Sequence, residues 1–217
     1  MRKKMQVKMA TAGVVALVML MTAMLGGASA VPDPESGPGW GAYDASLPNW
    51  GATDTRAQVS SPLVMTDTVG DSIYRKGDTT SIKVVHRASI VRLILRTRVA
   101  SNPATSPAWV VGFSNVQWAI DLNGGDPDFL VGGWNDGTQV LGEVVRIDGS
   151  FTHVCDATFG ASLDKLVLSF PRSCISNPSS IRVASRMQFD KYPTDPDAPL
   201  SEDLSPNNAN PTPFVTL

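Results

Sequence analysis

The chain has 217 residues, with 18 lysines and arginines, 20 aspartates and glutamates, 18 glycines, 16 prolines and two cysteines. This composition excludes a collagen, a coiled coil, a histone-like basic protein and a multidomain enzyme. No motif names a biochemical activity, but the patterns along the chain predict a destination and a fold.

Residues 1–30 have the features of a secretory signal peptide. Arg2, Lys3, Lys4 and Lys8 give a positive start, and residues 9–25 carry no charge. The segment ends in Ala28-Ser29-Ala30, the small-residue pattern that precedes signal-peptidase cleavage. An uncleaved anchor is the alternative, but the apolar run is short for a membrane span, which needs about 20 residues. We therefore expect cleavage after Ala30, secretion, and no membrane attachment afterwards.

The chain that remains after such cleavage is acidic. It runs from Val31 to Leu217 and keeps 14 of the 18 basic residues against 20 acidic ones, a net charge of −6. Nucleic acid and anionic membranes attract basic surfaces, so neither is expected as a partner. Its length predicts one domain with a sizeable core.

Residues 31–61 are rich in proline, glycine, serine and alanine and carry Trp40-Gly41-Ala42 and Trp50-Gly51-Ala52. This composition predicts an irregular arm. Two tryptophans are unusual in a disordered segment, so we expect the arm to dock on the domain. An aromatic platform that stacks on a sugar is the alternative.

From Pro62 onward the apolar residues recur with a period of two, which is typical of β-strands. A short strand at residues 62–65 is followed by a turn at 67–71. Apolar positions then alternate with polar ones over 82–86 and over 91–99, and the short link between these segments predicts a hairpin. Their apolar residues should face the core and their arginines should face water.

Further strands are expected at 116–122, 129–134, 138–147, 151–158, 166–170 and 181–189, with turns rich in glycine, asparagine and aspartate between them. About nine short strands and no convincing helix predict a single, all-β, antiparallel β-sandwich of jelly-roll or immunoglobulin-like type over residues 62–190. The proline-rich tail, residues 191–217, is expected to be irregular.

Cys155 and Cys174 are the two cysteines, and in an exported protein two cysteines predict one disulfide. It would tie together the two arms of the last hairpin before the tail. A redox or metal pair is the poorer alternative, because the spacing is not Cys-x-x-Cys and neither His86 nor His153 lies at ligand spacing.

The order of several segments is familiar: the turn Asp67-x-x-Gly70-Asp71, the paired strands 82–86 and 91–96, Trp118-Ala119-Ile120-Asp121, and Leu166 to Cys174. It resembles secreted β-sandwich proteins of actinobacteria and is similar in layout to DOMON and family-9 carbohydrate-binding-module sandwiches. The resemblance spans residues 62–190, about 60% of the chain, and implies a β-sandwich; most of the similar secreted proteins have no assigned function. The sugar platform of those modules has no matching residues here. DOMON domains that bind haem use methionine and histidine, but nothing in the sequence pairs His86 with Met187.

Two acidic turns are candidate calcium sites, because calcium prefers six to eight oxygen ligands and weak sites suffice outside the cell. Neither turn contains the full EF-hand loop. The alternative is that these residues simply form turns by bonding their own backbone. No other cofactor is expected. The first turn contains Asp121, Asn123, Asp126 and Asp128, and the second contains Asp67, Asp71 and Asp78.

Arginines and tryptophans supply the remaining candidates for binding. Five arginines fall on outward faces of predicted strands and would form an anion-binding stripe if those strands pair; a solvated sheet face is the alternative. Trp118 and His86 are expected in the core, with the histidine hydrogen-bonded. Trp109 and Trp134 border loops and are candidates for ligand stacking. The five arginines are Arg92, Arg96, Arg98, Arg182 and Arg186.

Catalysis finds little support. Gly70-Asp71-Ser72-Ile73 is close to the Gly-Asp-Ser-Leu block of one esterase class, but no histidine follows His153 to serve as its base. Glu35, Glu143 and Glu202 are too few and too scattered to predict a glycosidase pair. We expect a secreted, non-catalytic β-sandwich that acts as a binding or structural module for an unknown ligand. The alternatives are a carbohydrate-binding module at the cell wall or on a polysaccharide, and a hydrolase.

Overall fold

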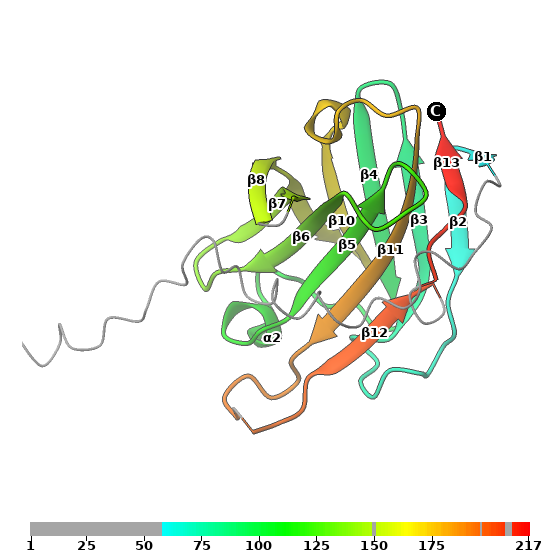
Figure 1. The fold of residues 1–217 in the computed structure, drawn as a ribbon. Coiled ribbons are helices and arrows are strands. Elements are labelled where there is room, and N and C mark those ends of the chain that lie inside the picture. The colour runs from blue at the N-terminus through cyan, green and yellow to red at the C-terminus, as the bar shows by residue number, and fades with distance from the viewer. Residues whose placement is uncertain (1–57, 149–150, 196, 207–209) are drawn as a thin grey trace, which may run out of the picture. The chain divides into compact units, whose positions relative to one another are not determined.

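The computed structural model describes residues 58–148, 151–195, 197–206 and 210–217. The predicted signal peptide and nearly all of the predicted arm lie outside these residues. The described residues belong to one compact unit. They form two sheets that lie one behind the other, with β5, β6 and β11 in front of β3, β4 and β10 (Figure 1). The prediction of an all-β sandwich is therefore confirmed.

The larger sheet has eight strands, and the smaller one has five. The larger follows the order β1 (Gln58–Ser60), β13 (Phe214–Thr216), β11 (Ser180–Phe189), β5 (Asn115–Asp121), β6 (Phe129–Asn135), β7 (Val140–Ile147) and β8 (Phe151–Asp156), with β12 (Ser201–Ser205) also beside β11. The smaller follows the order β2 (Leu63–Thr66), β3 (Thr79–His86), β4 (Ile90–Thr97), β10 (Lys165–Pro171) and β9 (Thr158–Ser162). The pairs are antiparallel except β1 with β13. Within the described residues, two short helices, α2 (Pro107–Val110) and η2 (Arg172–Ile175), each lie between a strand of the smaller sheet and a strand of the larger one.

The predicted hairpin is β3 and β4, and its period of two places alternate residues in the core. Leu93 and Leu95 are fully buried, while Arg92 and Arg96 on the same strand are exposed. Trp118 is buried in the core as expected. His86 is also buried, and its Nδ1 lies 3.0 Å from the Val215 carbonyl oxygen, so the expected hydrogen-bonded histidine is confirmed.

The central strands of the larger sheet are buried on both faces, which the alternation of their residues did not predict. Every residue of β5 is buried, and so are nine of the ten residues of β11. Small and apolar residues of this sheet, with Leu204 beside them, form a second buried cluster: Ala119, Leu130, Val145 and Ala184. Arg182 and Arg186 are therefore buried, and the expectation that they face water is wrong.

The tail was expected to be irregular, and this expectation is wrong for its strands β12 and β13. Both pair with β11, and β13 also pairs with β1. The sequence pattern hides them because β13 has three residues and β12 turns polar side chains inward, the reverse of the usual alternation. The strand expected at 151–158 likewise proves to be two strands, because the chain leaves the larger sheet after β8 and enters the smaller one as β9.

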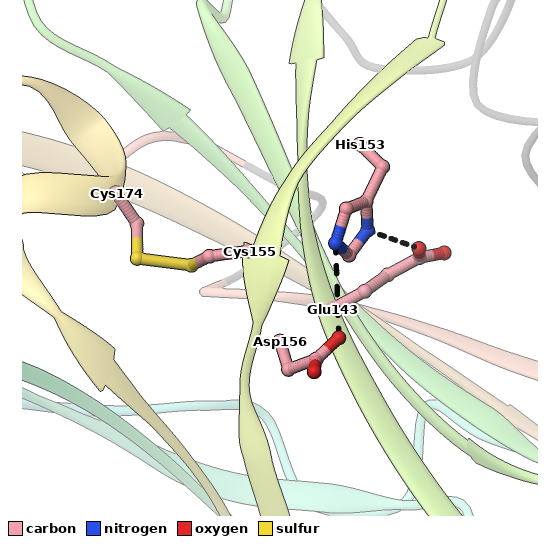
Figure 2. The surroundings of a disulfide bond; sticks show 5 residues. All are labelled: Glu143, His153, Cys155, Asp156 and Cys174. Carbon is pink, nitrogen blue, oxygen red and sulfur yellow. Dashed lines mark hydrogen bonds and ion pairs between the residues drawn. A yellow bond between two sulfur atoms is a disulfide. The ribbon is translucent and has the colours of Figure 1, made fainter.

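The predicted disulfide between Cys155 and Cys174 is present, with the Cα atoms 6.0 Å apart. Cys155 lies on β8 in the larger sheet, and Cys174 lies in η2, directly after β10 of the smaller sheet. Figure 2 shows the bond running from β8 to η2. The disulfide thus joins the two layers of the sandwich.

Replacing both cysteines with serine should lower the free energy of unfolding by about 3 kcal/mol, the loop-closure value for a loop of this length. The sequence separation is 19 residues. Urea unfolding of the oxidised wild type, the reduced wild type and the double variant measures the effect. The two forms without the bond should agree with each other, and a loss below about 1 kcal/mol would show that the bond does not hold the layers together.

Candidate functional site

A polar seam joins the two sheets at β12. The inward-facing residues of β12 each form a hydrogen bond with the segment that runs from β2 into β3, and the buried side chains alternate along the strand. The Thr79 amide donates to Asp203 Oδ2 at 2.5 Å, and the Ser205 hydroxyl donates to Asp67. The pairs that define the seam are Ser201 with Ser72, Asp203 with Thr79, and Ser205 with Asp67.

The seam brings three carboxylates to one point, here called the acidic cluster: Asp71, Asp78 and Asp203. One oxygen of each lies within 4.8 Å of the others, with Asp71 exposed and the other two buried. Asp67 lies near enough to raise the pKa of both Asp71 and Asp203 through charge repulsion. The structure therefore brings Asp71 and Asp78 of the second predicted acidic turn together with Asp203 from β12, and places Asp67 nearby.

Asp78 is the best compensated member of the cluster. Both of its oxygens accept the Gly70 amide, at 2.9 and 3.1 Å, and one lies 3.4 Å from an Arg98 guanidinium nitrogen. Gly70 has a φ of +95°, a backbone conformation that glycine adopts without steric cost. This explains why the turn carries glycine at that position. One guanidinium does not balance three carboxylates.

Asp203 is the least favourable place in the cluster for a negative charge. Burial raises its pKa, repulsion from Asp67 and Asp71 adds to the effect, and together they bring the pKa to about 7 despite the opposing hydrogen bond from the Thr79 amide. Burial and repulsion from Asp67 also raise the pKa of Asp71. At neutral pH the cluster is therefore poised to take up a positive charge, either a proton or a metal ion.

The Thr79 hydroxyl is a further oxygen beside the acidic cluster. This side chain is completely buried, and its oxygen has no hydrogen-bond partner among the described residues. It nevertheless lies close enough to Asp203 to lower the pKa of that carboxyl. An oxygen beside an acidic cluster is a suitable additional ligand for a hard cation.

The first predicted acidic turn is arranged differently. Asp121 is fully buried and forms an ion pair with fully buried Arg182. The Asp121 carboxylate also accepts the amides of Asn123 and Gly124, while Asp128 accepts the Leu122 amide at 2.8 Å. These contacts favour the alternative in which the aspartates form the turn by bonding its backbone. Asp126 is exposed.

The five arginines do not form one stripe. Arg92, Arg96 and Arg98 are exposed at or next to β4 of the smaller sheet, whereas Arg182 and Arg186 are buried on β11 of the larger sheet. The strands that carry them do not pair. Arg186 donates to Glu202 at 2.6 Å across the β11–β12 pair.

Of the two tryptophans proposed for stacking, Trp109 is covered by the protein and Trp134 is partly exposed. Trp109 lies in α2 rather than in a strand and is completely buried, with its indole N–H donating to Ser101 at 3.0 Å. Its ring packs against Phe159, with centroids 5.7 Å apart. Trp134 is half-buried in β6, where it pairs with Asn115 and Leu141.

His153 lies beside the disulfide on β8 and faces two carboxylates (Figure 2). Its Nδ1 is 3.3 Å from Glu143, and its Nε2 is 3.7 Å from Asp156. The His153 side chain is 54% exposed. The hydrogen-bond and ion-pair contacts of His153 within the described chain are with these two carboxylates.

The sequence reasoning missed Asp203 because it lies 125 residues after Asp78 in a tail that was expected to be irregular. The signal was present in Ser201-Glu202-Asp203-Leu204-Ser205, where polar residues that can form hydrogen bonds recur with a period of two. That period is typical of a strand with an inward polar face.

Asp121→Asn should destabilise the protein by about 3–5 kcal/mol, because it leaves the buried Arg182 guanidinium without its counter-charge. Urea unfolding should give the same loss in calcium and in chelator if Asp121 acts only through the ion pair and the turn. Asp164→Asn is the control: Asp164 pairs with Arg96 on the surface, and its change should stay below about 1 kcal/mol. A loss that appears only in calcium would instead support the predicted metal site in this turn.

The raised pKa of Asp203 predicts a pH-dependent cost of folding. The pKa of Asp203 is about 7 in the folded chain, against 3.8 for an ordinary aspartate. Because the folded state binds this proton more tightly than the unfolded state does, protonation stabilises the fold fully below pH 3.8. This stabilisation is lost as the pH rises to about 7. The shift corresponds to at most about 4 kcal/mol. In chelator, Asp203→Asn should therefore become more stable relative to the wild type between pH 4.5 and pH 8, as measured by urea unfolding. Parallel pH profiles would contradict the burial of an ionising Asp203.

Comparisons of this chain with models of protein families, with curated proteins and with solved structures find no match. The similarity to secreted sandwiches of the DOMON and carbohydrate-binding types therefore stays a prediction. The function must be inferred from the site itself.

Proposed function

We propose that this protein is an exported, non-catalytic β-sandwich binding module whose acidic cluster holds a divalent cation, with calcium as the preferred ion. The main observation behind this proposal is that one carboxylate oxygen of each of Asp71, Asp78 and Asp203 lies within 4.8 Å of the others, at the seam between the sheets. The raised pKa of Asp203 supports the proposal, and the buried Thr79 hydroxyl beside it offers a further oxygen ligand.

Calcium fits this arrangement better than magnesium. Calcium accepts irregular sets of six to eight oxygens, whereas magnesium requires nearly ideal octahedral geometry. The cluster is built from a turn, the start of β3 and a distant strand, and one of its carboxylates is exposed. Such a set leaves an exposed side at which solvent can complete the shell. Zinc prefers nitrogen and sulfur ligands, and the cluster consists of carboxylates.

The proposed location outside the cell rests on the signal-peptide pattern of residues 1–30 and on the disulfide, a bond that persists in oxidising compartments. Among the described residues, no helix is long and apolar enough to cross a membrane. Extracellular calcium is often millimolar, so even a weak site would be filled.

Thermal unfolding of the oxidised protein at pH 8, in chelator and in increasing calcium, tests the proposal. A ligand that binds only the folded state contributes about 2.7 kcal/mol at 100 times its Kd, or roughly 5–10 °C in Tm for a chain of this size. The rise should be much smaller at pH 5.5, where a proton occupies Asp203. Magnesium at equal concentration should have less effect.

Asp203→Asn separates cation binding from general salt effects. In chelator at pH 8 it should be more stable than the wild type, and calcium should no longer raise its Tm. Asp164→Asn, at the exposed pair with Arg96, should respond to calcium as the wild type does. No calcium shift in the wild type, or an equal shift in Asp203→Asn, would refute the cation site and leave the cluster as a proton-binding seam.

A further inference from the structure

A second feature of the same end of the sandwich is a cavity of about 590 Å³. It lies among Ile73–Lys76 of the β2–β3 connection, the start of α2 and the end of β11, on the side of the molecule where Figure 1 places α2 and β12. Cavities of about 300–1,000 Å³ are typical of small-molecule sites. The volume alone therefore allows a ligand, and the lining indicates its chemistry.

The walls of the cavity are mainly apolar. Among the lining residues, Phe189 and Ala108 are buried and Val99 is half-buried. Ile73 is 65% exposed at the rim. A large aliphatic side chain held in water next to an apolar hollow would be covered by an apolar ligand entering there.

The rim carries positive charge without any acidic lining residue. Arg75, Lys76 and Lys191 border the cavity, and all three are exposed. None of them forms an ion pair within the described residues. This concentration of cations outside ion pairs stands out on a chain whose net charge is −2. It creates a positive potential at the mouth of an apolar site.

Lys191 is held in place by aromatic rings. Its ammonium nitrogen lies 4.9 Å from the ring centroids of both Tyr74 and Tyr192. These rings are nearly perpendicular, at 86°, with centroids 6.1 Å apart. The arrangement positions a cation at the rim. It also disfavours a sugar platform, which requires rings that lie flat under the ligand.

The carboxylates near the cavity make contacts elsewhere in the protein. Asp190 precedes Lys191, but it is buried and accepts the amides of Phe113 and Tyr192. Asp71 and Asp78 flank the segment 73–76, and their oxygens meet Asp203 at the seam. The β2–β3 connection thus presents acids to the seam and cations to the cavity.

From these observations we infer that the cavity binds a small amphipathic anion: a carboxylate whose apolar tail fills the hollow while its head meets Arg75, Lys76 and Lys191. The inference stands apart from the cation site, since different side chains form it. A purely polar anion would leave the apolar lining unused. An uncharged lipid would leave these three cations without a counter-charge.

NMR titration in chelator with three ligands that share a ten-carbon tail tests the inference: decanoate, decanol and decyltrimethylammonium, each below its aggregation concentration. Decanoate should bind at least tenfold more tightly than the other two, with shifts centred on Ile73, Val99 and Phe189. Its affinity should fall with added salt, because charge contributes to binding. Chelator keeps calcium out of the experiment, so the outcome is independent of the cation site.

Charge-neutralising variants refine the test. The double variant Lys76→Gln with Lys191→Gln should weaken decanoate binding about tenfold and leave decanol unchanged. Lys83→Gln, on β3 and outside the cavity lining, is the matched control and should bind as the wild type does. The inference is overturned if decanoate does not bind, if decanol or the cationic ligand binds equally well, or if the shifts lie away from the cavity. An acidic peptide without apolar groups that binds as tightly as decanoate would also overturn it.

Discussion

The structure depends on a buried seam at which the chain places carboxylates between two sheets. Burying an ionised carboxylate is costly unless a hydrogen bond, a proton or a cation compensates it. Asp67 and Asp203 receive a hydroxyl and an amide, respectively, from across the seam. The remaining charge at the acidic cluster is met in part by Arg98. The stability of β12 is therefore tied to what neutralises Asp203.

Elsewhere the protein resolves the same problem within its own chain. Asp121 and Arg182 are both fully buried, and they neutralise each other across the β5–β11 pair. Such a pair contributes little net stability but is costly to break. The two acidic turns of the sequence thus differ in kind. In the first, the buried Asp121 carboxylate has its counter-charge within the chain, whereas the second gathers carboxylates that one arginine only partly compensates.

Much of the fold was predictable, because most strands show plain alternation. Leu93 and Leu95 face the core between exposed arginines, and turns rich in glycine and aspartate separate the strands. Prediction failed where polar groups face inward. Ser201, Asp203 and Ser205 look like loop residues until their partners from the β2–β3 connection are known. Arg182 looks solvent-exposed until Asp121 lies opposite it. Both features depend on contacts between residues far apart in sequence.

The two sheets are held together by different kinds of bond at the two sides of the sandwich. On the β8–β9 side, the chain crosses between the sheets and the disulfide bonds them covalently. On the opposite side, β12 is attached to the smaller sheet through side-chain hydrogen bonds. Local opening follows the weakest attachment. We therefore expect β12 to separate from the smaller sheet more readily than the two layers separate at the disulfide. Native-state hydrogen exchange should then be faster in β12 than in β10, and the opening of β12 would separate Asp203 from Asp71 and Asp78.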